Sequence, residues 1–271
     1  MLNIRPVHLL KGDRMSLFKK ELTRSFKKAF SLHEDTATHD EIKSRILSGG
    51  QVTGTNMCIL ICAILIASVG LNTGSTAVII GAMLISPLMG SILAMAYSVA
   101  SADSSRFRRH LYGFLIQVII SLIVSTLYFL LSPIDKPSTE LLARTQPSVY
   151  DVIIATAGGF AGIIGSTRKD KVTNIIPGVA IATALMPPVC TCGFALAHLK
   201  WQMLAGAGYL FIVNCYFIFL AAVLILDILK IPKVSAISDF QWRRLRRRMA
   251  RNTVIVLLPS ILFTVLMLKA S

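Results

Sequence analysis

The chain has few charged residues, and its longest apolar intervals have none. Asp, Glu, Lys and Arg make up 15% of the 271 residues, whereas hydrophobic residues make up 54%. A soluble globular domain is about 25% charged, so this composition excludes an ordinary soluble fold. The charge-free intervals are Ile46–Ala102, Leu111–Ile134, Val152–Thr167, Val172–Leu199, Trp201–Leu226 and Asn252–Leu268.

Catalytic and energy-coupling motifs are also missing. We find no His-Glu-x-x-His, no Gly-x-Ser-x-Gly, no carboxylate pair at membrane depth and no phosphate-binding loop. We therefore expect no enzyme, no cofactor and no metal site, and any transport would be passive, ion-coupled or driven by a partner. The lack of buried charges also argues against a carboxylate proton relay or a voltage sensor.

The apolar intervals predict an all-α integral membrane protein. A spanning helix needs about 20 apolar residues, and the first interval is long enough for two. Seven transmembrane helices follow, at Asn56–Leu71, Ala77–Ala100, Leu111–Leu131, Val152–Gly165, Ile175–Leu199, Met203–Leu229 and Thr253–Leu268. The fourth is short and rich in glycine, and the alternative for this segment is a re-entrant helix.

The net charge of +15 follows the predicted loops. With a cytoplasmic N-terminus, 24 of the 28 Lys and Arg residues fall on the inner side, and only Lys136, Arg144, Lys200 and Lys269 fall on the outer side. The positive-inside rule then places the N-terminus in the cytoplasm and the C-terminus outside. This distribution favours contact with anionic inner-leaflet lipids, and we expect no binding to nucleic acid.

Two basic segments flank the membrane domain. Residues 1–52 form a cytoplasmic segment that contains a basic amphipathic helix, and residues 230–271 form a basic cytoplasmic loop and the final helix. Such segments bind lipid headgroups, although the N-terminal helix could equally pack on a neighbouring subunit. The expected headgroup contacts are Lys19, Lys20, Lys27, Lys28, Arg243, Arg244, Arg246, Arg247 and Arg248.

Two stretches at membrane depth resemble each other. Ile80-Gly-Ala-Met-Leu-Ile-Ser-Pro87-Leu is followed 101 residues later by Ile181-Ala-Thr-Ala-Leu-Met-Pro-Pro188-Val. Because each unit holds three spans, the second copy must enter from the opposite face. The membrane domain 53–229 is thus predicted to be an inverted 3+3 repeat, 53–132 and 149–229, whose second and fifth helices are broken by proline.

Broken helices in inverted repeats form the binding sites of many secondary transporters. We therefore place a substrate or ion pathway at Ser86, Pro87, Gly90, Thr183, Pro187 and Pro188, joined by two polar residues in the paired third and sixth spans, Gln117 and Asn214. The alternative is that the prolines only kink packed helices, and that Gln117 and Asn214 hydrogen-bond between helices.

Small residues and cysteines have mainly packing roles in this interpretation. Gly158, Gly162 and Gly165 give the fourth span a face on which another helix can pack, within the subunit or between subunits. We expect a homo-oligomer. The five cysteines all fall in predicted spans, where they act as small polarisable packing residues.

The proline motifs also resemble a known family. Val78-Ile-Ile-Gly-Ala-Met-Leu-Ile-Ser-Pro-Leu-Met-Gly90 and Gly178-Val-Ala-Ile-Ala-Thr-Ala-Leu-Met-Pro-Pro188 are similar to domain-of-unknown-function family 389, a hydrophobic membrane domain of bacteria and archaea. The resemblance covers about Glu41 to Leu229 and implies a prokaryotic inner-membrane protein. It transfers no activity. Family members carry proline directly after Pro-Leu-Met-Gly, where this chain has Ser91.

Two functions are compatible with these features. The first is a transporter or channel for a small solute or ion that passes between the two repeats. The second is a non-transporting membrane scaffold or signalling subunit that acts through its cytoplasmic N-terminal segment. The sequence does not name the transported species, the coupling ion or the subunit number.

Overall fold

The computed structural model describes residue 24 and residues 36–169, 175–234 and 239–270. The chain divides into two compact units, Met1–Thr36 and Ala37–Ser271, and the account below concerns the second. The basic amphipathic helix expected near the N-terminus, with Lys19, Lys20, Lys27 and Lys28, lies outside the described residues. Residues 36–169, 175–234 and 239–270 form helices and connecting loops, with no β-strand among them.

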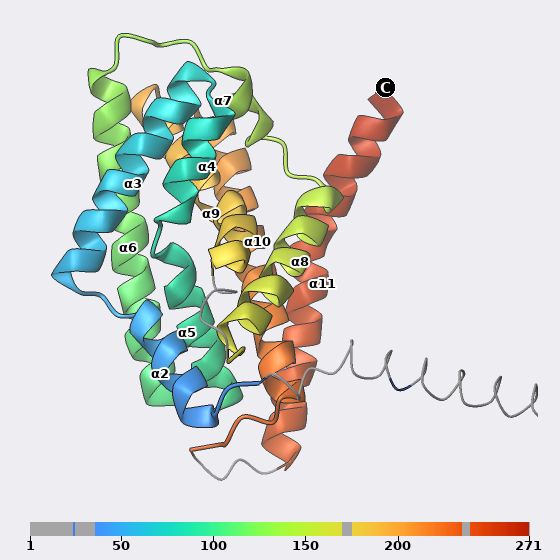
Figure 1. Cartoon of the computed structure of the whole chain (residues 1–271). Helices are drawn as coiled ribbons and strands as arrows, with labels where there is room; N and C mark the ends of the chain where they lie inside the picture. Colours follow the sequence, from blue (N-terminus) through green and yellow to red (C-terminus); the bar gives the residue numbers. More distant parts are fainter. Residues whose placement is uncertain (1–23, 25–35, 170–174, 235–238, 271) are drawn as a thin grey trace, which may run out of the picture. The chain divides into compact units, whose positions relative to one another are not determined.

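Ten helices are described in this unit. They are α2 (His39–Gly49), α3 (Gly54–Thr73), α4 (Thr76–Leu84), α5 (Leu88–Ala100), α6 (Ser104–Leu131), α7 (Thr139–Ala143), α8 (Val149–Ser166), α9 (Ile175–Ala197), α10 (Trp201–Ile228) and α11 (Asp239–Ala270). In Figure 1, α2 and the link between α5 and α6 lie at the lower end of the bundle, and α7 lies at the upper end.

Four helices in the described part of the chain are long and apolar enough to cross a membrane, namely α3, α6, α8 and α10. Together, α4 and α5 pass the same test as a pair bent by 47°, which raises the number to five. The glycine-rich fourth segment is thus one of the long helices. Some side chains of α9 and α11 lie outside the described residues, so these two helices do not enter this count.

Local capping signals set several helix ends. Thr38 begins α2, since its hydroxyl accepts a hydrogen bond from the Glu41 amide while its own N–H donates to the Glu41 carboxylate at 3.1 Å. The bond from the Thr38 amide is the main reason why the pKa of Glu41 is lowered. Gly50 ends α2. Ser148 and Asp151 form the same kind of capping box at the start of α8.

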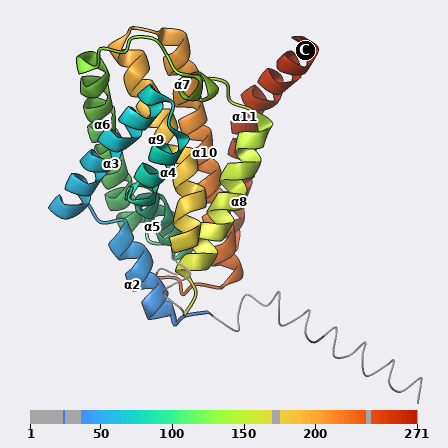
Figure 2. The ribbon, with the colours of Figure 1, turned by 45° about the horizontal axis from the view of Figure 1, so that its top comes forward.

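Helix α9 lies in the centre of the bundle (Figures 1 and 2), where it packs against α3, α4, α5, α6, α8 and α10. Every residue from Leu185 to Ala195 is buried. Phe194 meets Phe129 of α6 edge to face, with ring centroids 5.1 Å apart. The described half of α9 is therefore a core helix, surrounded by protein.

The small residues of α8 pack within the chain. Gly158, Gly159, Gly162 and Gly165 are all buried. A side chain at Gly159 would meet the backbone of Ile218 in α10 at 2.9 Å, so glycine is what lets the two helices approach. The face that the sequence predicts for helix contact is thus used inside the subunit.

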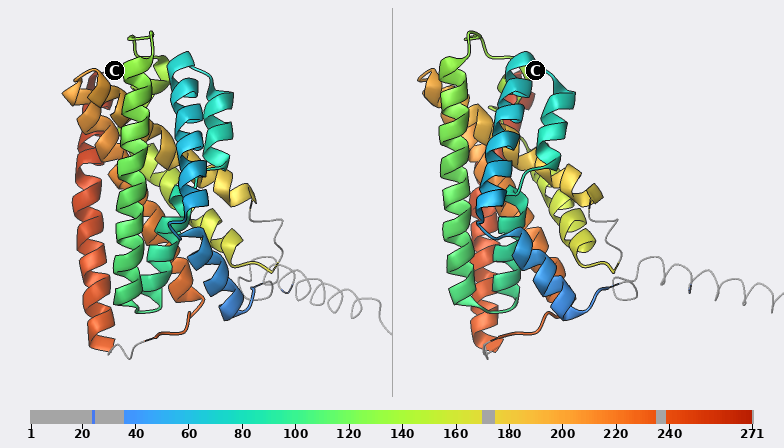
Figure 3. Two further views of the ribbon diagram at one scale, coloured as in Figure 1. Left: turned by 90° about the vertical axis from the view of Figure 1, so that its left-hand side faces the viewer. Right: turned by 60° about the vertical axis from the view of Figure 1, so that its left-hand side comes forward.

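The two proline motifs differ in the structure. The first motif contains a break in the helix between α4 and α5. Figure 3 shows these two helices one above the other with a short non-helical link between them. In contrast, α9 continues through Pro187 and Pro188, and this departs from the broken fifth helix that the sequence predicts. Proline fits the helical φ angle, and the lost backbone bonds are tolerated here because the helix is buried in protein.

Candidate functional site

The break between α4 and α5 is closed by local hydrogen bonds. The N–H groups of Ile85 and Ser86 donate to Ala82 and Met83 at 3.4 and 3.3 Å, in a tightened final turn of α4. Pro87 follows and has no N–H to continue the helix. The Ser86 hydroxyl accepts from the Leu88 amide at 3.4 Å, at the start of α5. Both Ser86 and Pro87 are half-buried, and Ser86 acts as a local cap.

Gly90 is a contact point between helices. A side chain here would collide with the backbone of Gly49, at the end of α2. The backbone carbonyl of Gly50, which follows Gly49, accepts a hydrogen bond at 3.1 Å from His110 of α6. The end of α2 is therefore held against the first turn of α5 and the start of α6. Sequence reasoning placed Gly90 in the pathway and missed Gly49, although the Gly-Gly pair was visible.

Gln117 lies at the centre of the buried polar groups. Its side-chain oxygen accepts from the Ser91 hydroxyl at 2.8 Å, and its backbone carbonyl accepts from Ser121 at 2.7 Å. All three residues are fully buried. The Gln117 amide nitrogen has no hydrogen-bond partner among the described residues. Ser91 thus places a buried hydroxyl in α5, four residues after Pro87.

The polar groups continue along α6. The Ser125 hydroxyl donates to the Cys190 carbonyl of α9 at 3.0 Å and lies 3.3 Å from the Ser68 hydroxyl of α3. Gln117, Ser121 and Ser125 are four residues apart, so they share one face of α6. We use the name polar seam for Ser68, Ser91, Gln117, Ser121 and Ser125, each of which is fully buried. The seam joins α3, α5, α6 and α9 without a charged side chain.

The remaining predicted pathway residues are placed as follows. Pro187 and Pro188 are buried inside α9, and the Thr191 hydroxyl donates to the Pro187 carbonyl at 2.9 Å. Asn214 is buried on α10, and none of the seam hydrogen bonds involves it. The side chain of Thr183 lies outside the described residues. The structure therefore groups Gln117 with serines that the sequence did not single out as a set.

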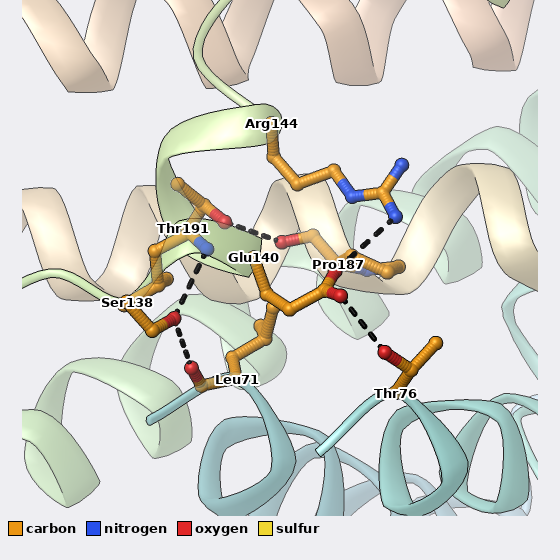
Figure 4. A network of polar contacts seen from close by, with 8 residues as sticks. Leu71, Thr76, Ser138, Glu140, Arg144, Pro187 and Thr191 are labelled. Carbon is orange, nitrogen blue, oxygen red and sulfur yellow. Dashed lines mark hydrogen bonds and ion pairs between the residues drawn. The ribbon is translucent and has the colours of Figure 1, made fainter. Parts of the chain in front are cut away.

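A second polar network holds α7 on the upper ends of α3 and α4 (Figure 4). The Ser138 hydroxyl donates to the Leu71 carbonyl and accepts from the Leu141 amide. Glu140 accepts from the Thr76 hydroxyl at 2.8 Å and pairs with Arg144 at 3.8 Å. The short helix α7 is thus fixed to the bundle by two side chains at its N-terminal end.

The cavities lie apart from the seam, and the cysteines include both buried and exposed residues. Three cavities of about 400, 410 and 430 Å³ have no seam residue in their walls. Cys190 and Cys192 are buried, whereas Cys58 and Cys62 are exposed on α3. In the part of the chain that the structure describes, no group of three His, Cys, Asp or Glu side chains could hold a metal ion.

The basic residues before the last helix are only partly described. Arg244, Arg247 and Arg248 are exposed at the start of α11. The side chains of Arg243 and Arg246 lie outside the described residues. The rest of the chain therefore leaves these three arginines uncovered.

Several apolar helices of membrane-spanning length and a buried set of uncharged polar residues are typical of a helical membrane protein. Comparison with known proteins identifies the family. Residues 83–220, about half of the chain, match the family described as "Domain of unknown function (DUF389)", and the chain belongs to it. This confirms the resemblance carried by the two proline motifs.

A relative is known from an archaeon. The chain is 27% identical over 187 residues to "Uncharacterized protein MJ0678" of Methanocaldococcus jannaschii. The match covers 69% of this chain and 56% of that protein, so the chain spans little more than half of its relative's length. No solved structure gives a significant match.

Proposed function

We propose that this chain is a multi-pass protein of the prokaryotic inner membrane that lets a small solute or ion pass along the polar seam. The observation that carries the proposal is the buried Gln117 amide nitrogen, which has no partner among the described residues. An unpaired buried donor costs about 1–3 kcal/mol. A passing ligand or water that accepts from this nitrogen would recover that cost.

The seam favours a ligand that is bound by oxygen atoms. The hydroxyl hydrogens of Ser91, Ser121 and Ser125 are already donated to oxygens of Gln117 and Cys190, so these hydroxyls can only accept further hydrogen bonds. Neutral oxygens suit a hydrated monovalent cation or a polar solute with hydrogen-bond donors, and the Gln117 nitrogen also requires that the solute, or a water that travels with the cation, accepts a hydrogen bond. The absence of charge from the seam removes the need for a carboxylate at membrane depth.

Seven spans and an inverted repeat belong to this proposal. The packing of the helices supports the repeat, because it is reciprocal: α6 packs on α9 while α10 packs on α5, and α3 packs on α6 while α8 packs on α10. Two three-helix units related by a two-fold axis in the membrane plane would pack in this way, with a binding site between them. The break between α4 and α5 lies in one of the two central segments.

The exposed face of α6 supports placement in a membrane. Ile119, Ile123, Leu127 and Leu130 are each more than half exposed. An exposed apolar face of this length would be a liability in water, and lipid would cover it. Arg106 lies in the first turn of α6 and Arg168 directly follows α8, and these two helix ends lie at the lower end of the bundle in Figure 1. These basic residues support a cytoplasmic N-terminus and an outer C-terminus.

Several partners complete the proposal. We include anionic inner-leaflet lipids at Arg244, Arg247 and Arg248, a second copy of the chain in a homo-oligomer, and a small solute or ion. Nucleic acid, cofactors and enzymatic chemistry have no part in it. The subunit number can be measured by light scattering on the purified protein.

The test is flux from liposomes that contain the purified protein, across a panel of inorganic ions and small metabolites. We expect Gln117→Leu to abolish a selective flux and Ser91→Ala to reduce it. Ser98→Ala is the matched control for Ser91→Ala. Ser98 is also a buried serine of α5, but its hydroxyl donates to the Ala94 carbonyl within α5. Ser86→Leu is less informative, since it also removes the cap of α5.

The controls decide between the two functions weighed above. Equal flux in Gln117→Leu and in the unmodified protein would refute the seam as the pathway. No flux across the panel, from a folded and oriented protein, would favour the scaffold function.

A further inference from the structure

A cavity of about 400 Å³ lies where the link between α2 and α3 meets the start of α6. Its wall consists of residues 50–53 of the link and of Arg109, His110, Tyr112, Gly113 and Ile116 of α6. Gly113 keeps it open toward the link, since a side chain there would come within 2.7 Å of Val52. The cavity lies at the start of the apolar part of α6, closer to the N-terminus of this helix than the seam.

His110 brings a ring nitrogen to this cavity. The residue is only 8% exposed, and its Nδ1 is bonded to the Gly50 carbonyl at 3.1 Å. Because a carbonyl can only accept, Nδ1 carries the hydrogen and Nε2 of the neutral ring is an acceptor. Within the described residues, Nε2 has no hydrogen-bond partner. The ring is therefore fixed by the link, with one acceptor left for a ligand.

Arg109 brings an available positive charge. It is exposed, and among the described residues it makes no hydrogen bond or ion pair. A guanidinium group binds phosphate through paired N–H donors, which makes it well suited to a phosphodiester. The polar end of the cavity thus offers a cation and a fixed acceptor on neighbouring residues.

The rest of the cavity wall includes exposed apolar residues. Val52, Tyr112 and Ile116 are 41%, 64% and 46% exposed. Ile116 continues into the exposed apolar face of α6 at Ile119 and Ile123. A ligand that fits both ends needs an anionic head and a long apolar tail, and it must enter from the lipid side.

We infer that this cavity binds one molecule of anionic phospholipid. Arg109 pairs with the phosphate, His110 Nε2 accepts from a headgroup hydroxyl, and an acyl chain lies against Val52 and Ile116. The inference rests on the membrane placement in the proposed function and is independent of transport. The site is also distinct from the basic residues of α11.

The test is native mass spectrometry of the full chain in detergent, titrated with phosphatidylglycerol and, separately, with phosphatidylcholine. We expect one tightly held phosphatidylglycerol. Arg109→Gln should weaken it about tenfold, which is the order expected for a lost charge-assisted hydrogen bond. Arg108→Gln is the matched control, because Arg108 is an exposed neighbour of the same charge that does not line the cavity.

A second variant separates the cavity from surface charge. Ile116→Trp keeps every charged group and fills the apolar end, so it should also displace the lipid. Equal losses in Arg109→Gln and Arg108→Gln, or full retention in Ile116→Trp, would overturn the site in favour of diffuse attraction. If inorganic phosphate at the same concentration as the lipid displaces phosphatidylglycerol, the ligand is a phosphate group and not a phospholipid. Lipid retention without flux would count against transport alone, and flux without lipid retention would count against this site alone.

Discussion

The Ser91 hydroxyl donates a 2.8 Å hydrogen bond to the side-chain oxygen of Gln117, and this bond joins α5 to α6 in the fully buried interior. Ser91 lies four residues after Pro87, in the first turn of α5. The break between α4 and α5 is therefore linked to Gln117 through Ser91. A change in the angle between α4 and α5 would move the hydroxyl to which Gln117 is bonded.

The strength of this contact can be measured by a double-mutant cycle. We expect Ser91→Ala and Gln117→Leu to show a coupling of about 1 kcal/mol in the free energy of unfolding, since a buried neutral hydrogen bond contributes about that much. The measurement is denaturant unfolding in mixed micelles. Ser98→Ala combined with Gln117→Leu serves as the reference, and comparable coupling in both pairs would contradict a specific bond.

Gly90 and Gly81 form a matched pair for stability. Gly90→Ala should lower the melting temperature, because the new methyl group would collide with the backbone of Gly49, which cannot rotate away. In contrast, a side chain at Gly81 meets nothing within 4 Å. Gly81→Ala should be neutral or stabilise by up to about 1 kcal/mol through helix propensity. Thermal unfolding of both variants gives the comparison, and similar melting temperatures would refute the tight contact.

Two tyrosines of α10 are predicted to hold α11 in place. The Tyr209 hydroxyl donates to the Val256 carbonyl at 2.6 Å, and the Tyr216 hydroxyl donates to the Met249 carbonyl at 2.9 Å. Tyr209→Phe with Tyr216→Phe removes both bonds at little cost in volume. We expect faster amide hydrogen exchange in α11 and unchanged exchange in α8. Unchanged exchange in both helices would show that apolar packing alone holds α11.

The orientation in the membrane can be tested by thiol labelling. Thr139 begins α7, Lys169 follows α8, and both are exposed. In Figure 1, α7 and the end of α8 lie at opposite ends of the bundle. Cysteine at position 139 should react with an impermeant reagent from outside, and cysteine at 169 should react only after permeabilisation. The background needs Cys58 and Cys62 replaced by alanine, since both are exposed on α3. The reverse labelling would invert the topology.

Local features of the fold were predictable, whereas contacts between distant segments were not. The ends of α2, the start of α7 at Ser138 and the start of α8 at Ser148 can be explained by capping residues and glycine, which act within a few positions. Gln117 could be found as a polar residue in an apolar helix. Its partner Ser91 could not, because 26 residues separate the two and serine is common in membrane helices.

The same limit explains the difference at α9. Two consecutive prolines predict a broken helix from local chemistry alone. Burial on all sides is a property of the assembled bundle, and it lets the described part of α9 remain helical through Pro187 and Pro188. A proline motif therefore marks a position of interest without fixing its backbone.

The central position of α9 has a consequence for biogenesis. Among its contact partners is α10, which is synthesised after it, so α9 cannot reach its final surroundings when it first leaves the ribosome. Until α10 arrives, its proline pair must wait against lipid, the translocase or a chaperone. A nascent chain that stops after residue 200 should consequently be a substrate for membrane quality control, while one that extends past α10 should escape degradation.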